Sequence, residues 1–589
     1  TNSLLVGTDS TGTLSSADGN TGVGTGVFGA LTTGDNNVAV GLNALLSNTT
    51  AGQNTAVGKD SLKLNLTAEK NTAIGDSALR QNTTGANNTA VGVSALLTNT
   101  TASNNTATGF RALCLNTTGS DNTAMGYEAL VANTTGAQNV AIGKDSLLAS
   151  TTAGSNTAVG HDALTATTTG GQNNAFGDGA MSANTIGCRN VAMGNGVMIK
   201  NTEGLCNTAL GHIAMQCNVT GDNNTAVGAS ALHKNTASDN VAIGCGSLSC
   251  NTTGTQNTAL GLEAMKFGTT GDYNTALGAC TLGASDVNTG DNNVAVGRKS
   301  MFDNTSGASN VAVGSGSLAN NTTGESNAAL GINALYTNTT GGWNVAIGRN
   351  ALYYNTTASN NVGIGFGALE RNTTGTLNTG VGDGALYLNT TASNNTALGA
   401  SALAANTTGT PNTAFGKSAL EKNTTAADNV AIGAFSLRCN ITGAGNTAVG
   451  SSALNVNLGS NNTAVGKYTL VSNTTGACNT SVGKNSMLAN TTGANNVAMG
   501  ALALEANTTG FQNVAVGSLA LITNTTGQEN TAVGYKAGIC TTTGCGITAI
   551  GMCALHCHTT GGDNNAVGMC SQFTTTTGFG NNSMGHKSM

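Results

Sequence analysis

Asn54-Thr55-Ala56-Val57-Gly58 is a stretch of sequence that recurs, with small changes, from one end of the chain to the other. It returns as Asn71-Thr72-Ala73-Ile74-Gly75 and, near the other end, as Asn530-Thr531-Ala532-Val533-Gly534. The terminal glycines run from Gly7 to Gly585 in steps of 17 residues, apart from two steps of 16 and one of 19. The 589 residues therefore form one array of 34 complete repeats.

The repeat has a fixed residue pattern when the terminal glycine is numbered 0. Asn lies at −4, Thr or Val at −3, Ala at −2 and an apolar residue at −1, followed by Ala or Ser at +3, Leu or Met at +4 and Asn-Thr-Thr at +7 to +9. Two short apolar runs separated by glycine and by this loop predict two short strands and two turns. A helix is excluded, because each interior glycine would cost about 1 kcal/mol.

The length of the repeat indicates the architecture. Propeller blades need about 40 residues and leucine-rich repeats about 20 to 29, so 17 residues with two short strands predict one coil of an all-β, parallel β-solenoid. Stacked coils are about 4.8 Å apart, which predicts a rod on the order of 160 Å long. Each coil contacts only its neighbours, so a single long domain is expected.

Three parts of the chain can be distinguished. Residues 1–40 lack the Asn-Thr-Thr loop and are expected to form irregular coils that act as a cap or junction. Residues 41–589 are expected to form the continuous rod, and its final coils, 534–589, are rich in cysteine. The two extra residues of the 19-residue repeat, near 283–288, are expected in the wide loop, where insertions are tolerated.

The pattern also predicts which side chains face inward. We expect the −1 and +4 residues to fill the core of each coil, with −3 half-buried and the −2 alanine on the opposite face. A nearly invariant small residue there suggests close approach of a second surface. Leucine in place of Ala56 and Ala73 should accordingly disrupt assembly more than folding.

Composition excludes several classes of function. Charged residues make up 8% of the chain, aromatic residues 3%, and the formal net charge is −6, so no basic stripe is available for nucleic acid. No apolar run approaches the 18 or so residues of a membrane span, and no leader is expected. No carboxylate pair, catalytic triad or phosphate-binding loop stands out, so we predict no enzyme, no metal and no cofactor.

The Asn-Thr-Thr loops are formally glycosylation sequons. Glycans on consecutive coils would start only about 4.8 Å apart, so a ladder of stacked asparagine amides is favoured, with partial glycosylation left open. The asparagines concerned share position +7: Asn48, Asn65, Asn82, Asn99, Asn116, Asn133, Asn321, Asn338, Asn355, Asn372, Asn389, Asn406, Asn423, Asn473, Asn490, Asn507 and Asn524.

Aromatic residues gather between the repeats that begin at Gly331 and Gly382, and they form a candidate ligand patch. Three of them occupy +5, which predicts a stabilising aromatic ladder or, alternatively, a surface for a sugar or a receptor. The patch comprises Tyr336, Trp343, Tyr353, Tyr354 and Tyr387.

Cysteines in the last coils form two in-register pairs, Cys540 with Cys557 and Cys553 with Cys570. A spacing of about 4.8 Å lies within the Cα range of a disulfide, so both pairs are candidate disulfides. A zinc site from Cys553, His556, Cys557 and His558 is an alternative, although their spacing matches no standard zinc motif.

The pattern Asn-Val-Ala-Ile-Gly, at 139–143, 344–348 and 429–433, resembles the repeated strand motif in the heads of trimeric autotransporter adhesins. Similar long repeats occur in predicted viral and phage tail-fibre proteins. The resemblance implies a left-handed parallel β-roll, a homotrimer, and a fibre that is extracellular, on a cell surface or on a virion surface.

Together these features predict a structural, adhesive fibre whose partners are other copies of the chain, packed laterally and stacked head to tail, with a cell-surface or glycan receptor as a further partner. The alternative is a binding module of the ice-binding or carbohydrate-binding kind. Adjacent Thr49 and Thr50 would face opposite ways on a strand, which argues against the flat threonine array that an ice-binding surface needs.

Overall fold

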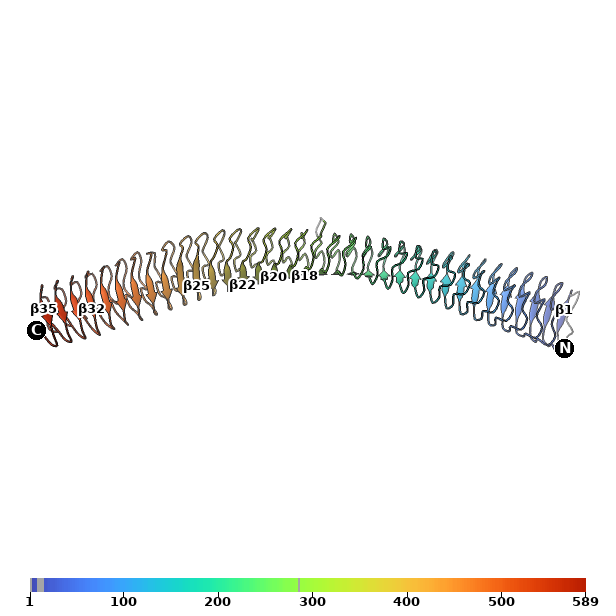
Figure 1. The fold of residues 1–589 in the computed structure, drawn as a ribbon, viewed down its shortest axis with the longest axis horizontal. Coiled ribbons are helices and arrows are strands. Elements are labelled where there is room, and N and C mark those ends of the chain that lie inside the picture. The colour runs from blue at the N-terminus through green and yellow to red at the C-terminus, as the bar shows by residue number, and fades with distance from the viewer. Residues whose placement is uncertain (1–2, 8–14, 284–286, 589) are drawn as a thin grey trace. The chain divides into compact units, whose positions relative to one another are not determined.

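The computed structural model describes residues 3–7, 15–283 and 287–588, and their regular secondary structure is entirely β. The chain divides into two compact units, Thr1–Asn292 and Asn293–Met589. Each repeat contributes one short strand, and the strands of both units can be followed in Figure 1. The strand ends just before the glycine at position 0, which we call the register glycine. The two extra residues of the long repeat overlap 284–286, which lie outside the described residues; beyond them, Asn288 pairs with Gly268 of the preceding coil.

The strands of the first unit are β1 Leu4–Val6, β2 Thr21–Val23, β3 Val38–Val40, β4 Thr55–Val57, β5 Thr72–Ile74, β6 Thr89–Val91, β7 Thr106–Thr108, β8 Thr123–Met125, β9 Val140–Ile142, β10 Thr157–Val159, β11 Asn174–Phe176, β12 Val191–Met193, β13 Thr208–Leu210, β14 Thr225–Val227, β15 Val241–Ile243, β16 Thr258–Leu260 and β17 Thr275–Leu277. The strands of the second unit are β18 Val294–Val296, β19 Val311–Val313, β20 Ala328–Leu330, β21 Val345–Ile347, β22 Val362–Ile364, β23 Thr379–Val381, β24 Thr396–Leu398, β25 Asn412–Phe415, β26 Asn429–Ile432, β27 Thr447–Val449, β28 Thr463–Val465, β29 Thr480–Val482, β30 Val497–Met499, β31 Val514–Val516, β32 Thr531–Val533, β33 Thr548–Ile550, β34 Asn565–Val567 and β35 Asn582–Met584.

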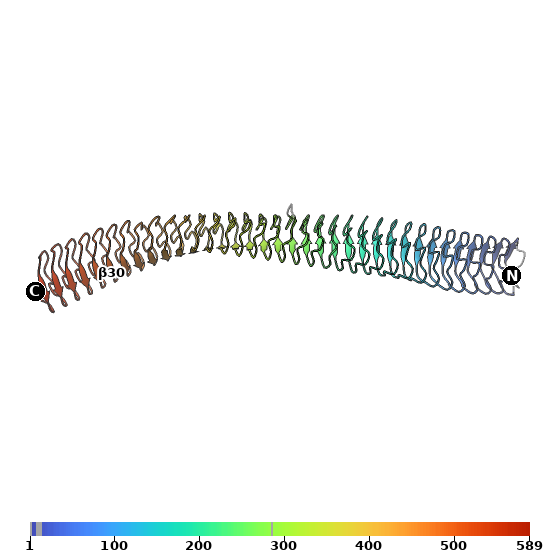
Figure 2. The same cartoon turned by 45° about the horizontal axis from the view of Figure 1, so that its top comes forward.

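Within each unit every strand pairs in parallel with the strand of the next coil, in the same register. In β4 and β5, for example, Thr55 pairs with Thr72 and Val57 with Ile74. Both views show these strands side by side in chain order within a unit (Figures 1 and 2). The predicted all-β parallel solenoid with coils of 17 residues is therefore confirmed.

The prediction of two strands per coil is wrong, because only the run that ends at −1 is a strand. In the second run the backbone alternates into the left-handed region, with φ of +61° at Ser77 and +48° at Leu79. A strand requires negative φ at every residue. The second run is therefore a series of turns, and it still buries Ala78 and Leu79 completely.

The predicted inward and outward faces of the strand are reversed. Ala73 at −2 is fully buried, whereas Ile74 at −1 keeps 41% of its surface exposed. The cause is a thin core between the strand and the +4 leucine. At Gly363, another −2 position, an added Cβ would lie 3.3 Å from Cγ of Leu352. Alanine is therefore selected by the space inside the coil, and not by a second surface outside it.

The register glycines are fixed by the distance between coils. Gly58 has φ of +135°, and a Cβ on it would lie 2.3 Å from the carbonyl oxygen of Gly75 in the next coil. A side chain at this position would meet backbone, which cannot move aside without breaking the strand pairing. The glycine that marks the repeat in the sequence thus marks the closest approach of neighbouring coils.

The +7 asparagines form the predicted ladder. Asn116 donates through Nδ2 to Oδ1 of Asn99 at 2.9 Å and to the carbonyl oxygen of Gly119 at 2.9 Å, and its own Oδ1 accepts from Asn133 at 2.8 Å. All three side chains are fully buried. The stack therefore satisfies amide groups inside the coil while linking each coil to the next.

A second ladder, at −4, was not anticipated from the sequence. The backbone N–H of Asn139 donates to Oδ1 of Asn122 in the preceding coil at 2.9 Å. Nδ2 of Asn122 in turn donates to the carbonyl oxygen of Gly136 at 2.9 Å, which also accepts from Asn133 of the first ladder. The two ladders converge on this +10 carbonyl and hold the wide loop against the strand.

Candidate interaction surface

The outward side of each strand presents its −1 residue, and we call this column of residues the outer lane. In the first unit the outer lane comprises Val6, Val23, Val40, Val57, Ile74, Val91, Thr108, Met125, Ile142, Val159, Phe176, Met193, Leu210, Val227, Ile243, Leu260 and Leu277. In the second unit it comprises Val296, Val313, Leu330, Ile347, Ile364, Val381, Leu398, Phe415, Ile432, Val449, Val465, Val482, Met499, Val516, Val533, Ile550, Val567 and Met584.

The outer lane is apolar except at Thr108, and it is partly open to solvent in both units. Leu330 is 49% exposed, and Met125, Leu210 and Leu398 are exposed to a similar degree. Contiguous apolar surface of this extent is unusual on a soluble monomer and is typical of interaction sites, which makes the outer lane a candidate contact surface. The neighbouring −3 column, mainly Thr and Val, is mostly half-buried and adds no charge to the lane.

The energy available from the outer lane can be compared with the cost of association. Full burial of a Leu or Ile side chain contributes about 1.5–3 kcal/mol, so covering the exposed two-fifths of one lane residue contributes roughly 0.6–1.2 kcal/mol. Association costs about 4–15 kcal/mol in lost freedom. Contact along roughly ten or more coils is therefore needed, and each unit has that many.

The structure brings four of the five predicted ligand-patch residues to one side of the second unit. Tyr336 and Tyr353 stack with ring centroids 5.1 Å apart, and Tyr354 meets Tyr353 edge-on at 4.6 Å. Tyr387 lies two coils beyond Tyr353 and its hydroxyl donates to Glu370 at 3.4 Å. Burial, and then the neighbouring tyrosines, raise the pKa of Tyr353.

Trp343 does not join this group. It occupies −5, in the loop before β21, and is 57% exposed. The prediction from the sequence did not include Arg371 in the ligand patch. The guanidinium carbon of Arg371 lies 4.8 Å from the ring centroid of Tyr354. Its position, +6 in the coil after Tyr354, is the signal that could have identified it.

Both predicted cysteine pairs lie at equivalent positions of adjacent coils, and all fourteen cysteines are thiols in this structure. Burial raises the pKa of Cys540 and of Cys553, with a smaller contribution from the partner cysteine in each case. A raised pKa makes a thiol less reactive at neutral pH. The disulfides remain predictions.

The four alternative zinc ligands do not form a group among the described residues, although Sγ of Cys557 lies 3.6 Å from Nδ1 of His556. His556 stacks on the ring of Phe573 at 4.5 Å, whereas His558 is fully buried in the +7 column, where asparagine stands in most coils. Burial lowers the pKa of His558, partly offset by a hydrogen bond with the backbone of Gly578. Its Nδ1 atom has no hydrogen-bond partner among the described residues.

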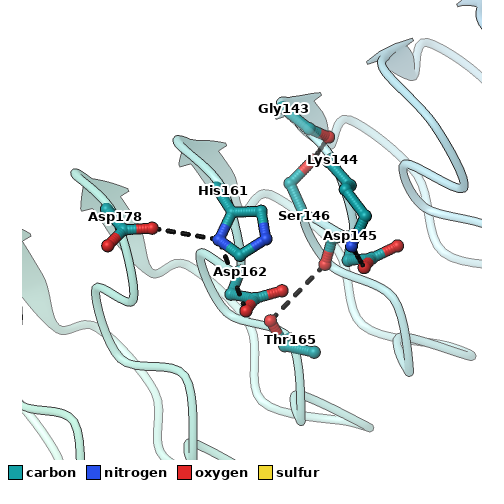
Figure 3. Close-up of polar contacts among 8 residues, drawn as sticks. All are labelled: Gly143, Lys144, Asp145, Ser146, His161, Asp162, Thr165 and Asp178. Atoms are coloured by element: carbon teal, nitrogen blue, oxygen red, sulfur yellow. Dashed lines mark hydrogen bonds and ion pairs between the residues drawn. The ribbon is translucent and has the colours of Figure 1, made fainter.

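In the part of the chain that the structure describes, one group of three metal-type ligands lies close together: Asp145, His161 and Asp162, with ligand atoms within 4.8 Å of one another. Nδ1 of His161 lies 3.4 Å from Asp162 and 3.0 Å from Asp178 of the next coil, while Lys144 pairs with Asp145 (Figure 3). The hydrogen bond with Asp145 raises the pKa of Lys144. These contacts account for the cluster as a surface network of ion pairs.

The +7 asparagines cannot carry glycans in the folded coil. Their side chains are fully buried, and both Nδ2 protons of a residue such as Asn116 are donated within the protein. Attachment of a sugar would replace one of these donors and require space that the coil does not have. The ladder is therefore the interpretation that agrees with the geometry.

Among the described residues, no helix has the length and apolar character needed to cross a membrane. No family model matches the chain, and no curated protein was found to match it. The fold thus defines a β-solenoid repeat protein with asparagine ladders.

Proposed function

We propose that the protein is the subunit of a structural fibre in which copies pack side by side through their outer lanes. The observation that supports this proposal is the partly exposed apolar residue at −1 of nearly every coil. A second copy carries the same lane with the same spacing between coils, so contacts made at one coil repeat at the next without mismatch. Three copies is the number that the resemblance of the strand motif implies.

The adhesive role and the location on a cell or virion surface belong to the same proposal. They are supported by the likeness of the strand motif to adhesin heads and to tail-fibre repeats. Head-to-tail stacking also stays a prediction, and electron microscopy of purified protein tests it, since continuous fibres support stacking and rods with discrete ends contradict it.

Ice binding is less well supported than protein contact. An ice-binding face requires a flat, regular array, whereas Val91, Met125 and Phe176 in the outer lane differ widely in size. The +8 threonines are engaged as well: Oγ1 of Thr83 donates to the carbonyl oxygen of Thr100 at 2.9 Å. Thermal hysteresis is therefore expected to be absent.

Sedimentation velocity tests lateral packing. The wild-type chain is expected to sediment as an oligomer, and the triple substitution Ile74→Asp, Met125→Asp and Leu210→Asp should yield monomers, because carboxylates would be buried between lanes. The matched control is Thr101→Asp, Thr118→Asp and Thr135→Asp, which places the same charges on exposed +9 positions. A monomeric wild type, or an oligomer that survives the triple substitution, would contradict the proposal.

A further inference from the structure

An open groove crosses four consecutive coils of the second unit on the side that carries the tyrosines. Its volume is about 390 Å³, and it lies over turns that are distinct from the outer lane. The residues that line it occupy +6 and +8 of their coils: Tyr354, Arg371, Thr373, Leu388, Thr390 and Thr407.

The aromatic wall of the groove is held in place by its neighbours. Tyr354 packs edge-on against Tyr353, which itself stacks on Tyr336, so the exposed ring has few alternative positions. Arg371 lies over the same ring, with 4.8 Å from its guanidinium carbon to the centroid. A planar ring beside a planar cation presents a rigid platform at low cost in conformational entropy.

The guanidinium of Arg371 has N–H donors that form no ion pair among the described residues. Among the residues that the structure describes, no carboxylate pairs with it, whereas Arg438 on the same side of the unit pairs with Glu421 at 2.8 Å. The adjacent Glu370 is turned to the hydroxyl of Tyr387. A guanidinium has five N–H donors in a fork that matches a carboxylate or a sulfate. The groove therefore favours an anionic group beside Tyr354.

The opposite wall consists of threonine side chains in a row along the stacking direction. Thr373, Thr390 and Thr407 each donate to the carbonyl of the following coil, at 3.0, 3.2 and 3.0 Å. The hydroxyl groups are thus turned to the backbone, and the lining of the groove is mainly apolar, which suits the C–H faces of sugar rings. Because the threonines repeat about every 4.8 Å, the groove suits an extended chain of repeating units and not a compact molecule.

We propose that this groove binds an acidic polysaccharide, with an anionic group on Arg371 and sugar rings packed on Tyr354 and along the threonine row. Nucleic acid is disfavoured, because a run of phosphates requires a row of cations, and the net charge of the chain is −6. The proposal names a ligand class for the adhesive role but does not depend on lateral packing, because the groove lies outside the outer lane.

Isothermal titration calorimetry of the full chain tests the proposal with three probes: polygalacturonate oligomers for carboxylate, dextran sulfate for sulfate, and neutral dextran. One or both anionic probes are expected to bind, and neutral dextran to bind much more weakly. The substitutions Tyr354→Ala and Arg371→Gln should each lower the affinity about tenfold or more, because each removes a stacking surface or a charged donor.

A second cation–aromatic pair provides the control. Lys467 lies 4.8 Å from the ring centroid of Tyr468, which is as exposed as Tyr354. Tyr468→Ala and Lys467→Gln should therefore leave binding unchanged. Absence of binding to both anionic probes, equal binding of neutral dextran, or equal loss in the control variants would overturn the proposal. Because the outer lane is intact in all these variants, their sedimentation should match the wild type whatever the binding result.

Discussion

At the scale of single residues, the coil depends on positions where the spacing between coils leaves no choice. Gly177 at position 0 has φ of +135°, and its missing Cβ would lie 2.2 Å from the carbonyl oxygen of Gly194. Gly179, two residues later, has φ of +64° and nothing within 4 Å of where a Cβ would stand. Gly177 is therefore required by a steric clash with the next coil, whereas Gly179 is favoured only by its left-handed φ.

Gly177→Ala is expected to destabilise the coil by about 3 kcal/mol or more, since it combines an unfavourable φ with a backbone clash. Gly179→Ala should cost only about 1 kcal/mol, because a left-handed φ is its sole penalty. Chemical denaturation measures both values. Equal destabilisation by the two substitutions would show that contact between coils does not select the register glycines.

The asparagine ladder has a gap that makes its contribution measurable. Ser150 replaces asparagine at +7, and both its Oγ and Oδ1 of Asn133 are buried without a hydrogen-bond partner. Ser150→Asn should stabilise the protein by about 1 kcal/mol, because the new amide can donate to Asn133 and to its own loop. The converse substitution, Asn116→Ser, should destabilise by about 2–3 kcal/mol through three lost hydrogen bonds. A stabilising effect of Asn116→Ser in thermal denaturation would refute this view of the ladder.

At the scale of the strand and its turns, the sequence predicted the coil well and its faces poorly. The period, the parallel pairing and the +7 ladder follow from the recurrence of Gly, Ala and Asn at fixed spacing. Which face of the strand points inward does not follow from the sequence, because alternation allows Thr72 and Ile74 to face either inward or outward. The inward face is determined by the thin core, and the core is thin because the residues at +2 and +4 adopt left-handed φ. A leucine such as Leu79 gives no indication in the sequence that its φ is positive.

Ala73→Leu is expected to disturb folding, because a fully buried alanine in a thin core would be replaced by a side chain with three more carbons. We expect a loss of about 2–3 kcal/mol. Ile74→Asp, one residue further along the same strand, should leave the fold intact, as circular dichroism can verify. If instead Ala73→Leu folded with normal stability, the assigned inward face would be wrong.

His558 gives the last coils a dependence on pH. Burial lowers its pKa in the folded state, so the unfolded chain binds a proton first as the pH falls. Stability should be constant well above the unfolded pKa of about 6.5 and should fall by up to about 1.4 kcal/mol per pH unit below it.

The matched variant is His558→Asn, which restores the usual +7 residue and should remove this dependence between about pH 5 and pH 7. Hydrogen exchange of β33 and β34 at several pH values is the measurement. The same pH dependence in both proteins would contradict the assignment to His558.

At the scale of the whole molecule, each unit satisfies most of its buried polar groups internally and leaves the apolar outer lane partly exposed. The ladders at −4 and +7 use buried amides to join neighbouring coils. The outer lane residues do not pack inside the coil. Because each contributes little when covered, the free energy of burying them exceeds the cost of association only when many coils are covered together. A fibre of laterally packed copies is the arrangement that uses this surface fully.

Cryo-electron microscopy of the purified full chain tests the central claim most directly. The account predicts a reconstruction in which two or more solenoids contact one another through the strand faces, with density from residues such as Ile74 and Leu330 between them. A reconstruction of single solenoids with solvent along that face, or of copies joined through the threonine loops instead, would contradict it.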